Sequence, residues 1–318
     1  MPDEVVLALL AAASFAASHV VSKRGLEGTS ITAAFMVIVA CAWAVVSIPV
    51  LLDPPASVPT RSIVLFAISG FFAPAIARAA ALAGVHKLGP SIAVPIQQGL
   101  RPVMVLPAAA LVLGEGFGLL RVVGVVAIVA GGWVLARQPG GGSSDVPVDP
   151  ITDEDTNLRV GGSMRARVRH RSVAVSRGFR PGVIYPFVAA VAYSTSDLLV
   201  KSGLDTASNP AFGALVSVGS GLVVWSMAHA LPQVRRRFRV GHDVGWLILS
   251  GALMGGAILL VFNAFDRGDV SVVAPVVATQ PLFVFLFSTL ILRHLERIER
   301  STVIAGVFVV IGTIVVSM

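Results

Sequence analysis

One arginine stands deep inside a long apolar stretch, between residues 85 and 115. Arg101 lies about eleven residues into its apolar run, which is roughly 16 Å along a helix. If this run crosses a membrane, the guanidinium costs at least a few kcal/mol unless it is paired or hydrated. Two interpretations remain open. Arg101 either forms a fork for an anionic group of a ligand, or it forms an internal ion pair or caps carbonyl groups beside Pro102.

Amide side chains accompany this arginine. Gln280 has the corresponding place in a second apolar stretch and is neutral. Gln97 and Gln98 precede Arg101 by about one turn and, being adjacent, point roughly 100° apart on a helix. We therefore expect at most one of them to face the same cavity, and Gln97, four residues before Arg101, is preferred. Hydrogen bonding between helices is the alternative role.

Four further polar residues interrupt apolar runs. His19 and Asp197 are candidate proton carriers or interfacial hydrogen-bonding residues. Arg78 either lines a pathway or extends to a membrane surface, and Asn263 is expected to line the same half as Asp197. The predicted substrate pathway therefore contains Arg101, Gln97, Gln280, Arg78, His19, Asp197 and Asn263.

Motifs typical of enzymes do not occur in the sequence. It contains no H-E-x-x-H, no C-x-x-C and no G-x-x-x-x-G-K. Its single cysteine, Cys41, allows no internal disulfide. We expect no catalytic residues, no metal site and no cofactor, so the protein is not predicted to be an enzyme. Without an ATP site, any transport is driven by a gradient or is passive.

The composition indicates a membrane protein. Hydrophobic residues make up 55% of the 318 residues and charged residues only 13%, which is too little polar surface for a soluble globule. Runs of about 20 apolar residues recur. The predicted fold is an all-α polytopic membrane protein with ten spans, at residues 4–22, 31–52, 62–85, 90–113, 118–136, 183–200, 210–231, 245–265, 270–292 and 301–317.

The chain divides into two similar halves. Residues 138–181 are rich in Gly and Ser and segregate acidic from basic residues, which predicts a disordered linker between repeats at 1–137 and 182–318. The run from Ser18 to Leu26 recurs as Ser196 to Leu204, at an offset of 178 residues. Because five spans is an odd number, the second repeat must be inverted, and the site is expected at midplane between the repeats.

Loop charge predicts the orientation. Four Lys and Arg residues fall on the face with both termini, and eighteen fall on the face with the linker. The positive-inside rule therefore places the linker in the cytoplasm and both termini outside a multi-pass protein of the cell membrane. Anionic lipid headgroups are expected partners of the basic loops. Nucleic acid is not an expected partner, and homo-oligomerisation stays open.

These features resemble the EamA-type branch of the drug/metabolite transporter superfamily. The resemblance rests on S-x-x-x-x-K at Ser18–Lys23 and Ser196–Lys201, on the A-V-P and P-V patterns of spans four and nine, and on L-G-E at Leu113–Glu115, followed by a glycine-rich span. It implies a transporter of small solutes, often an exporter of amino acids or other metabolites. Members usually have cytoplasmic termini, from which the loop charge of this chain departs.

The first functional hypothesis is a secondary transporter that exports a small anionic or zwitterionic metabolite, such as an amino acid, by alternating access. The alternatives are a passive facilitator and, less favoured, a membrane-embedded enzyme or lipid-handling scaffold. If Arg101 binds substrate, Arg101→Gln should leave expression normal and raise the half-saturation constant by about one to two decades.

Overall fold

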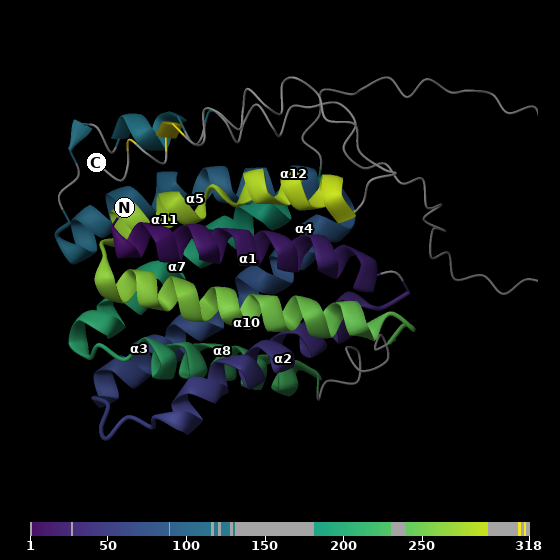
Figure 1. The fold of residues 1–318 in the computed structure, drawn as a ribbon, viewed down its shortest axis with the longest axis horizontal. Coiled ribbons are helices and arrows are strands. Elements are labelled where there is room, and N and C mark those ends of the chain that lie inside the picture. The colour runs from purple at the N-terminus through teal and green to yellow at the C-terminus, as the bar shows by residue number, and fades with distance from the viewer. Residues whose placement is uncertain are drawn as a thin grey trace, which may run out of the picture.

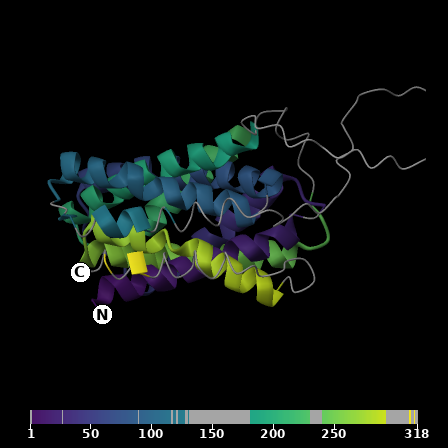
Figure 2. The same ribbon diagram turned by 90° about the horizontal axis from the view of Figure 1, so that it is seen from above.

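Long helices lying side by side form the fold (Figure 1, Figure 2). The computed structural model describes residues 2–26, 28–88, 90–115, 118–119, 122–127, 130, 181–229, 240–291, 311–312 and 315. The first half contains α1 (Asp3–Gly25), α2 (Ile31–Leu52), α3 (Thr60–Gly70), the π-helical turn η1 (Phe71–Ala77), α4 (Arg78–Leu88) and α5 (Pro90–Leu113). The second half contains the 3₁₀ turn η2 (Pro181–Val183), α7 (Ile184–Thr206), α8 (Pro210–His229), α10 (Val244–Arg267), α11 (Val270–Val277) and α12 (Gln280–Ile291).

Seven helical segments in these ranges are long and apolar enough to cross a membrane. They correspond to predicted spans one to four and seven to nine, with ends that differ by a few residues. Span six corresponds to α7, whose 23 residues are long enough but include the polar run from Ser194 to Asp197. Spans five and ten lie largely outside the described residues, as does the linker. An all-helical, polytopic membrane fold is therefore confirmed, and the number of ten spans stays a prediction.

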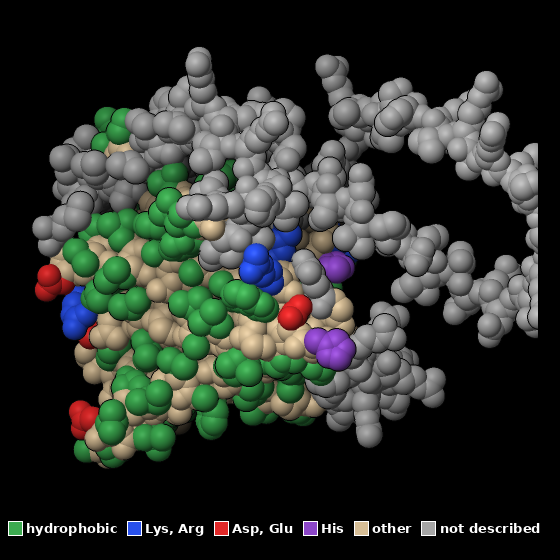
Figure 3. Space-filling model, turned by 45° about the vertical axis from the view of Figure 1, so that its right-hand side comes forward, with side chains coloured by type: hydrophobic (Ala, Val, Ile, Leu, Met, Phe, Trp, Pro, Cys, Tyr) green, Lys and Arg blue, Asp and Glu red, His purple; other side chains and the backbone are tan. Residues whose placement is uncertain are grey.

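The outer surface of the bundle is suited to lipid. Figure 3 shows hydrophobic side chains spread over one flank, with charged side chains and histidines mostly toward its ends. Leu51, Leu111 and Leu119 each expose more than three quarters of their surface. Apolar exposure of this extent on a soluble protein would mark a binding surface. Here it is the surface expected to contact hydrocarbon chains.

Local signals in the sequence determine several helix ends. The Ser30 side chain accepts a hydrogen bond from Ala33 N at 3.3 Å and caps α2. Asn209 Oδ1 accepts from Phe212 N at 3.1 Å and caps α8, whose first residue is a proline, a position that needs no N–H donor. At the end of α5, Gly114 has φ +69°, the left-handed conformation that favours glycine.

Helices α1 and α10 pack closely and run antiparallel. A Cβ atom added to Gly25, at the end of α1, would lie 2.5 Å from a carbon of Leu247, near the start of α10. A Cβ atom added to Gly268, just after α10, would lie 2.7 Å from Cγ of Glu4, at the start of α1. Both glycines therefore allow a close approach, and a larger residue at either position would have to displace the side chain of Leu247 or Glu4.

The same pairing recurs between α7, which corresponds to α1 in the repeat, and the segment from α3 to α4, which corresponds to α10. A Cβ atom on Gly203, in α7, would lie 2.6 Å from the Phe66 ring in α3, and one on Gly182 would lie 2.9 Å from Leu88 at the end of α4. The segment from α3 to α4 therefore runs antiparallel to α7. Because successive helices alternate in direction, α1 and α7 cross the bundle in opposite senses, as inverted repeats require.

A second pair of contacts obeys the same symmetry. A Cβ atom on Gly70 in α3 would lie 1.9 Å from the Ser217 carbonyl oxygen in α8. A Cβ atom on Gly251 in α10 would lie 2.6 Å from the Ile38 carbonyl oxygen in α2. Gly251 follows Gly70 by 181 residues, and Ser217 follows Ile38 by 179. These offsets match the sequence repeat, so small residues at equivalent positions make equivalent helix contacts.

Two interruptions distinguish the helices that border the centre of the bundle. The π-helical turn η1 contains Pro74, which lacks an N–H donor, and Trp225 Nε1 donates to the Ala75 carbonyl oxygen at 3.0 Å. Span nine is broken between α11 and α12, where Thr279 Oγ1 donates to Val276 O at 2.8 Å. The corresponding span of the first repeat, α5, stays helical throughout despite three internal prolines. The symmetry is therefore approximate at the centre.

Candidate functional site

A cavity of about 60 Å³, lined by both polar and apolar side chains, lies between the two halves. Its wall draws on α1, η1, α4 and α5 from the first half and on α7, α8, α10 and α12 from the second. Most of the apolar lining comes from α10, with Met254, Ile258, Val261, Phe262 and Phe265. The polar lining residues are His19, Arg78, Gln97, Gln98, Arg101, Tyr193, Ser196, Asp197, Ser217 and Gln280.

Arg101 and Asp197 form a buried ion pair across the halves. Arg101 Nε donates to Asp197 Oδ2 at 2.7 Å, and Nη2 donates to Oδ1 at 2.6 Å. The two side chains are only 6% and 7% exposed. This two-bond geometry matches the planar guanidinium to the carboxylate. Of the two interpretations of Arg101, the structure therefore supports the internal ion pair. Its partner, Asp197, is the residue of the second repeat that corresponds to His19.

Neighbours on α7 hold Arg101 in place. The Arg101 Cζ atom lies 5.4 Å from the centre of the Tyr193 ring, within the range of a cation–π contact. Ser194 Oγ donates to the Arg101 carbonyl oxygen at 3.2 Å. Residues 193, 194 and 197 thus all contact Arg101. Tyr193 directly precedes the polar run from Ser194 to Asp197 within an apolar span, and this position is the sequence signal for it.

Arg78 is the second buried cation of the cavity, and its side chain is 1% exposed. Its Nη1 atom lies 3.3 Å from His19 Nδ1 and 3.5 Å from Nε2, and Nη2 donates to Ser18 Oγ at 3.3 Å. Because a guanidinium only donates, the imidazole nitrogen that bonds it must be an unprotonated acceptor. Arg78 Nε has no partner among the described atoms. Arg78 therefore faces the interior rather than extending to a membrane surface.

An amide pair closes another part of the cavity wall. Gln98 Nε2 donates to Gln280 Oε1, which links α5 to the first residue of α12. Within the described atoms, Gln98 Oε1 and Gln280 Nε2 are buried without partners. Gln97 also lines the cavity. The expectation that only one of the two adjacent glutamines faces it is thus wrong, because the cavity borders a broad sector of α5.

Asn263 is the one predicted pathway residue that does not line the cavity. It lies on α10, half-buried, and its Nδ2 donates to the Leu259 carbonyl oxygen of its own helix at 2.8 Å. The other six predicted residues surround the cavity. Gln98, Ser196 and Ser217 join them. Hydropathy alone does not identify serines as lining residues, because serines in membrane helices also serve close packing.

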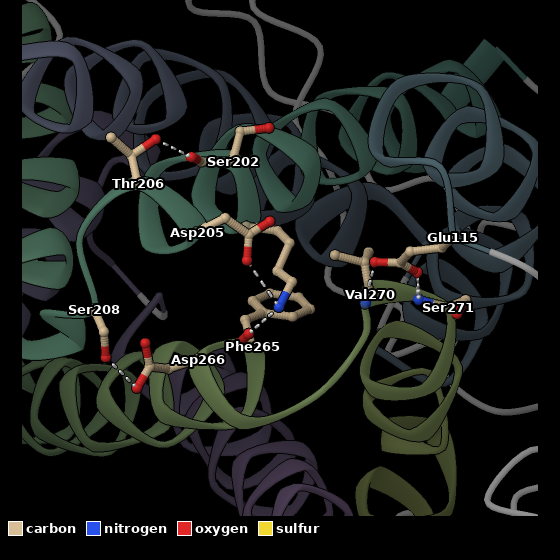
Figure 4. A network of polar contacts seen from close by, with 10 residues as sticks. Glu115, Ser202, Asp205, Thr206, Ser208, Phe265, Asp266, Val270 and Ser271 are labelled. Carbon is tan, nitrogen blue, oxygen red and sulfur yellow. Dashed lines mark hydrogen bonds and ion pairs between the residues drawn. The ribbon is translucent and has the colours of Figure 1, made fainter.

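Polar side chains near the helix ends form a network of contacts (Figure 4). Glu115 accepts hydrogen bonds from Val270 N and Ser271 N, both at 2.9 Å, and so caps α11 from the end of span four. Lys201 Nζ donates to the Phe265 carbonyl oxygen at 3.1 Å near the end of α10 and pairs with Asp205 at 3.1 Å. Glu296, which occupies the position of Glu115 in the second repeat, lies outside the described residues.

The part of the chain that the structure describes contains no group of His, Cys, Asp or Glu side chains that could hold a metal ion. The polar groups of the cavity are two guanidinium groups, one imidazole, amides and hydroxyl groups around one carboxylate. This donor set is suited to hydrogen bonding with an organic solute or anion and lacks the several oxygen or sulfur ligands that metals prefer.

A bundle of membrane-spanning helices, packed as two inverted halves around a buried cavity with polar side chains from both halves, is an architecture of secondary transporters. The chain belongs to the EamA-like transporter family, which it matches over residues 4–137 and 180–318. No curated protein matches it. A solved structure titled "Crystal structure of protein" is similar, with a TM-score of 0.67 and 17% identity, over 99% of this chain and 96% of that chain. At this identity the likeness shows the fold alone.

Proposed function

We propose that the protein is a secondary transporter that exports a small anionic or zwitterionic metabolite by alternating access. The observation that carries the proposal is the cavity, because its polar side chains come from both halves and join them. Arg101 bonds Asp197, and Gln98 bonds Gln280, each across the boundary between halves. Rocking of the halves would expose these groups to one side of the membrane and then to the other. Export is favoured by the family resemblance.

Two features support movement rather than a fixed pore. The cavity is small and surrounded by buried residues, and the helices that border it are interrupted at η1 and between α11 and α12. Broken helices at the site allow local change without loss of the whole helix bundle. The sequence has no phosphate-binding loop for ATP, so a solute or ion gradient is the proposed source of energy.

The test begins with metabolite profiles of medium and cytosol from cells that lack or overproduce the protein. The compound that changes most is then loaded into proteoliposomes. We expect saturable flux that accumulates solute against its own gradient when a proton or sodium gradient is imposed. Flux that never exceeds equilibrium would favour the passive facilitator. Absence of flux for every enriched compound would favour the enzyme or lipid-handling alternative. Vesicles without protein are the control.

Orientation is tested by cysteine labelling of intact cells. In a Cys41→Ser background, Ser143→Cys in the linker should resist an impermeant maleimide, because the positive-inside rule places this segment in the cytoplasm. Ser57→Cys, in the exposed loop between α2 and α3 on the opposite face, should react fully and is the matched control. Ready labelling at position 143 with protection at position 57 would reverse the orientation and give the family's usual cytoplasmic termini.

A further inference from the structure

The charges around the cavity do not balance within the described residues. Arg101 and Asp197 cancel each other through two hydrogen bonds. Arg78 is equally buried, but its hydrogen-bond partners are neutral: the His19 imidazole, the Ser18 hydroxyl group and the Tyr193 hydroxyl group. The described wall of the cavity therefore carries one positive charge without a carboxylate partner. A buried charge with only neutral partners is costly, so this arginine is suited to the reversible binding of an anion.

The position of Arg78 suits ligand contact. It is the first residue of α4 and follows the π-helical turn η1 directly, where Ala73 and Pro74 also line the cavity. Its Nε atom is buried and has no partner among the described atoms. An arginine can present Nε and one Nη together to a carboxylate, as Arg101 does to Asp197. In Arg78 the Nε–H group of such a fork is still open, whereas its two Nη atoms contact the neutral groups of His19 and Ser18.

The amide pair provides a second, uncharged recognition element. Gln98 and Gln280 bond each other and leave one carbonyl oxygen and one NH₂ group buried and unpartnered. Turning both amides together exchanges the two roles but still leaves one acceptor and one donor. Such a pair is matched by a hydroxyl or amide group of a ligand, which both donates and accepts. The apolar wall of α10, which includes Ile258 and Phe262, leaves room for a short carbon skeleton.

We propose that the cavity binds a small organic monoanion, with its carboxylate on Arg78 and an uncharged hydrogen-bonding group at the Gln98–Gln280 pair. This inference rests on the proposed transport function and specifies its substrate class. It assigns the anion to Arg78 rather than to Arg101, whose two donors already bond Asp197. Cations are disfavoured by the charge of Arg78. Dianions would leave one charge unpaired in a buried site.

The test is ligand-dependent thermal stability of the purified full-length protein, followed by tryptophan fluorescence. The probes are acetate and L-lactate, which share the carboxylate and differ by a hydroxyl group, with methyl lactate, succinate, chloride and choline as comparisons. A ligand that binds only the folded state raises Tm with its concentration. We expect L-lactate to stabilise most, acetate less, and methyl lactate, succinate and choline little or not at all.

Variants locate the binding site. Arg78→Gln should lower the apparent affinity for L-lactate by at least about tenfold, the effect of losing charge-assisted hydrogen bonds, and Arg78→Lys should lower it less. Arg61→Gln removes a positive charge from an exposed position at the start of α3 and is the matched control, with unchanged affinity expected. If Arg78→Gln does not fold, the comparison of L-lactate with its neutral methyl ester on the unaltered protein still decides the role of charge.

Several outcomes would overturn the proposal. They are equal stabilisation by L-lactate and methyl lactate, preference for choline or succinate, full stabilisation by chloride alone, no stabilisation by either monocarboxylate, or unchanged affinity in a folded Arg78→Gln variant. These results differ from failure of the transport function. Binding that depends on Arg78 without flux in proteoliposomes would contradict transport alone, whereas flux that is unaffected by Arg78→Gln would contradict the substrate class alone.

Discussion

Asp197→Asn should greatly lower the yield of folded, monodisperse protein obtained from membranes. Adding Arg101→Gln to this variant should restore the yield. The single change leaves the Arg101 guanidinium buried without a counter-charge, where the intact pair has two hydrogen bonds of 2.6 and 2.7 Å. Breaking a buried pair by removing one partner costs about 3–5 kcal/mol, whereas replacing both partners is often close to neutral. Yield and thermal stability after size-exclusion chromatography measure the effect.

The matched control is Asp205→Asn, the same substitution on the same helix. Asp205 pairs with Lys201, but its side chain is 51% exposed, and exposed pairs contribute about 0–1 kcal/mol. We expect its yield to match the unaltered protein. If Asp197→Asn behaved like Asp205→Asn, the pair with Arg101 would not be a stabilising contact of the folded state.

This expectation replaces the one that follows from the sequence alone. If Arg101 binds ligand directly, Arg101→Gln should express normally and lower the affinity for ligand. The structure gives Asp197 as its partner, so the single Arg101→Gln change leaves a buried carboxylate unpaired and should be destabilising. The double variant separates the two roles, because it restores folding and then allows transport to be measured without the pair.

Gly70→Ala should disrupt the packing of α3 against α8 and destabilise the protein. The added Cβ atom would lie 1.9 Å from the Ser217 carbonyl oxygen and 2.0 Å from Ser220 Oγ. A backbone carbonyl cannot turn aside as a flexible side chain can, so the helices must separate. Overpacking typically costs about 1–3 kcal/mol and occasionally more, and we expect the upper end of this range. A large drop in thermal stability and in yield would be the measured result.

Gly256→Ala is the control for this substitution. Gly256 also lies within a membrane-spanning helix, but a Cβ atom there meets nothing within 4 Å. Alanine has higher helix propensity than glycine, so this variant should be as stable as the unaltered protein or slightly more so. Equal stability of Gly70→Ala and Gly256→Ala would mean that α3 and α8 do not pack as the structure places them.

The sequence by itself determined the membrane class, the ends of most spans and the twofold repetition. Hydropathy is a local property that adds up along a window, and caps such as Ser30 act on their own helix. Repetition is visible because Gly70 and Gly251 occupy equivalent positions, at which close helix packing leaves no room for a side chain. These are signals that each residue or short segment carries without reference to distant ones.

Only the tertiary structure decided which polar groups meet. Arg101 and Asp197 are 96 residues apart, and nothing in either helix specifies that α5 lies beside α7. The burial of Arg78 depends in the same way on the helices around α4, which carry its partners His19 and Ser18. Partner choice is set by the packing of whole helices against each other, which depends on shape as well as on composition. A buried charge in a sequence therefore predicts that a partner exists, and the fold determines which residue it is.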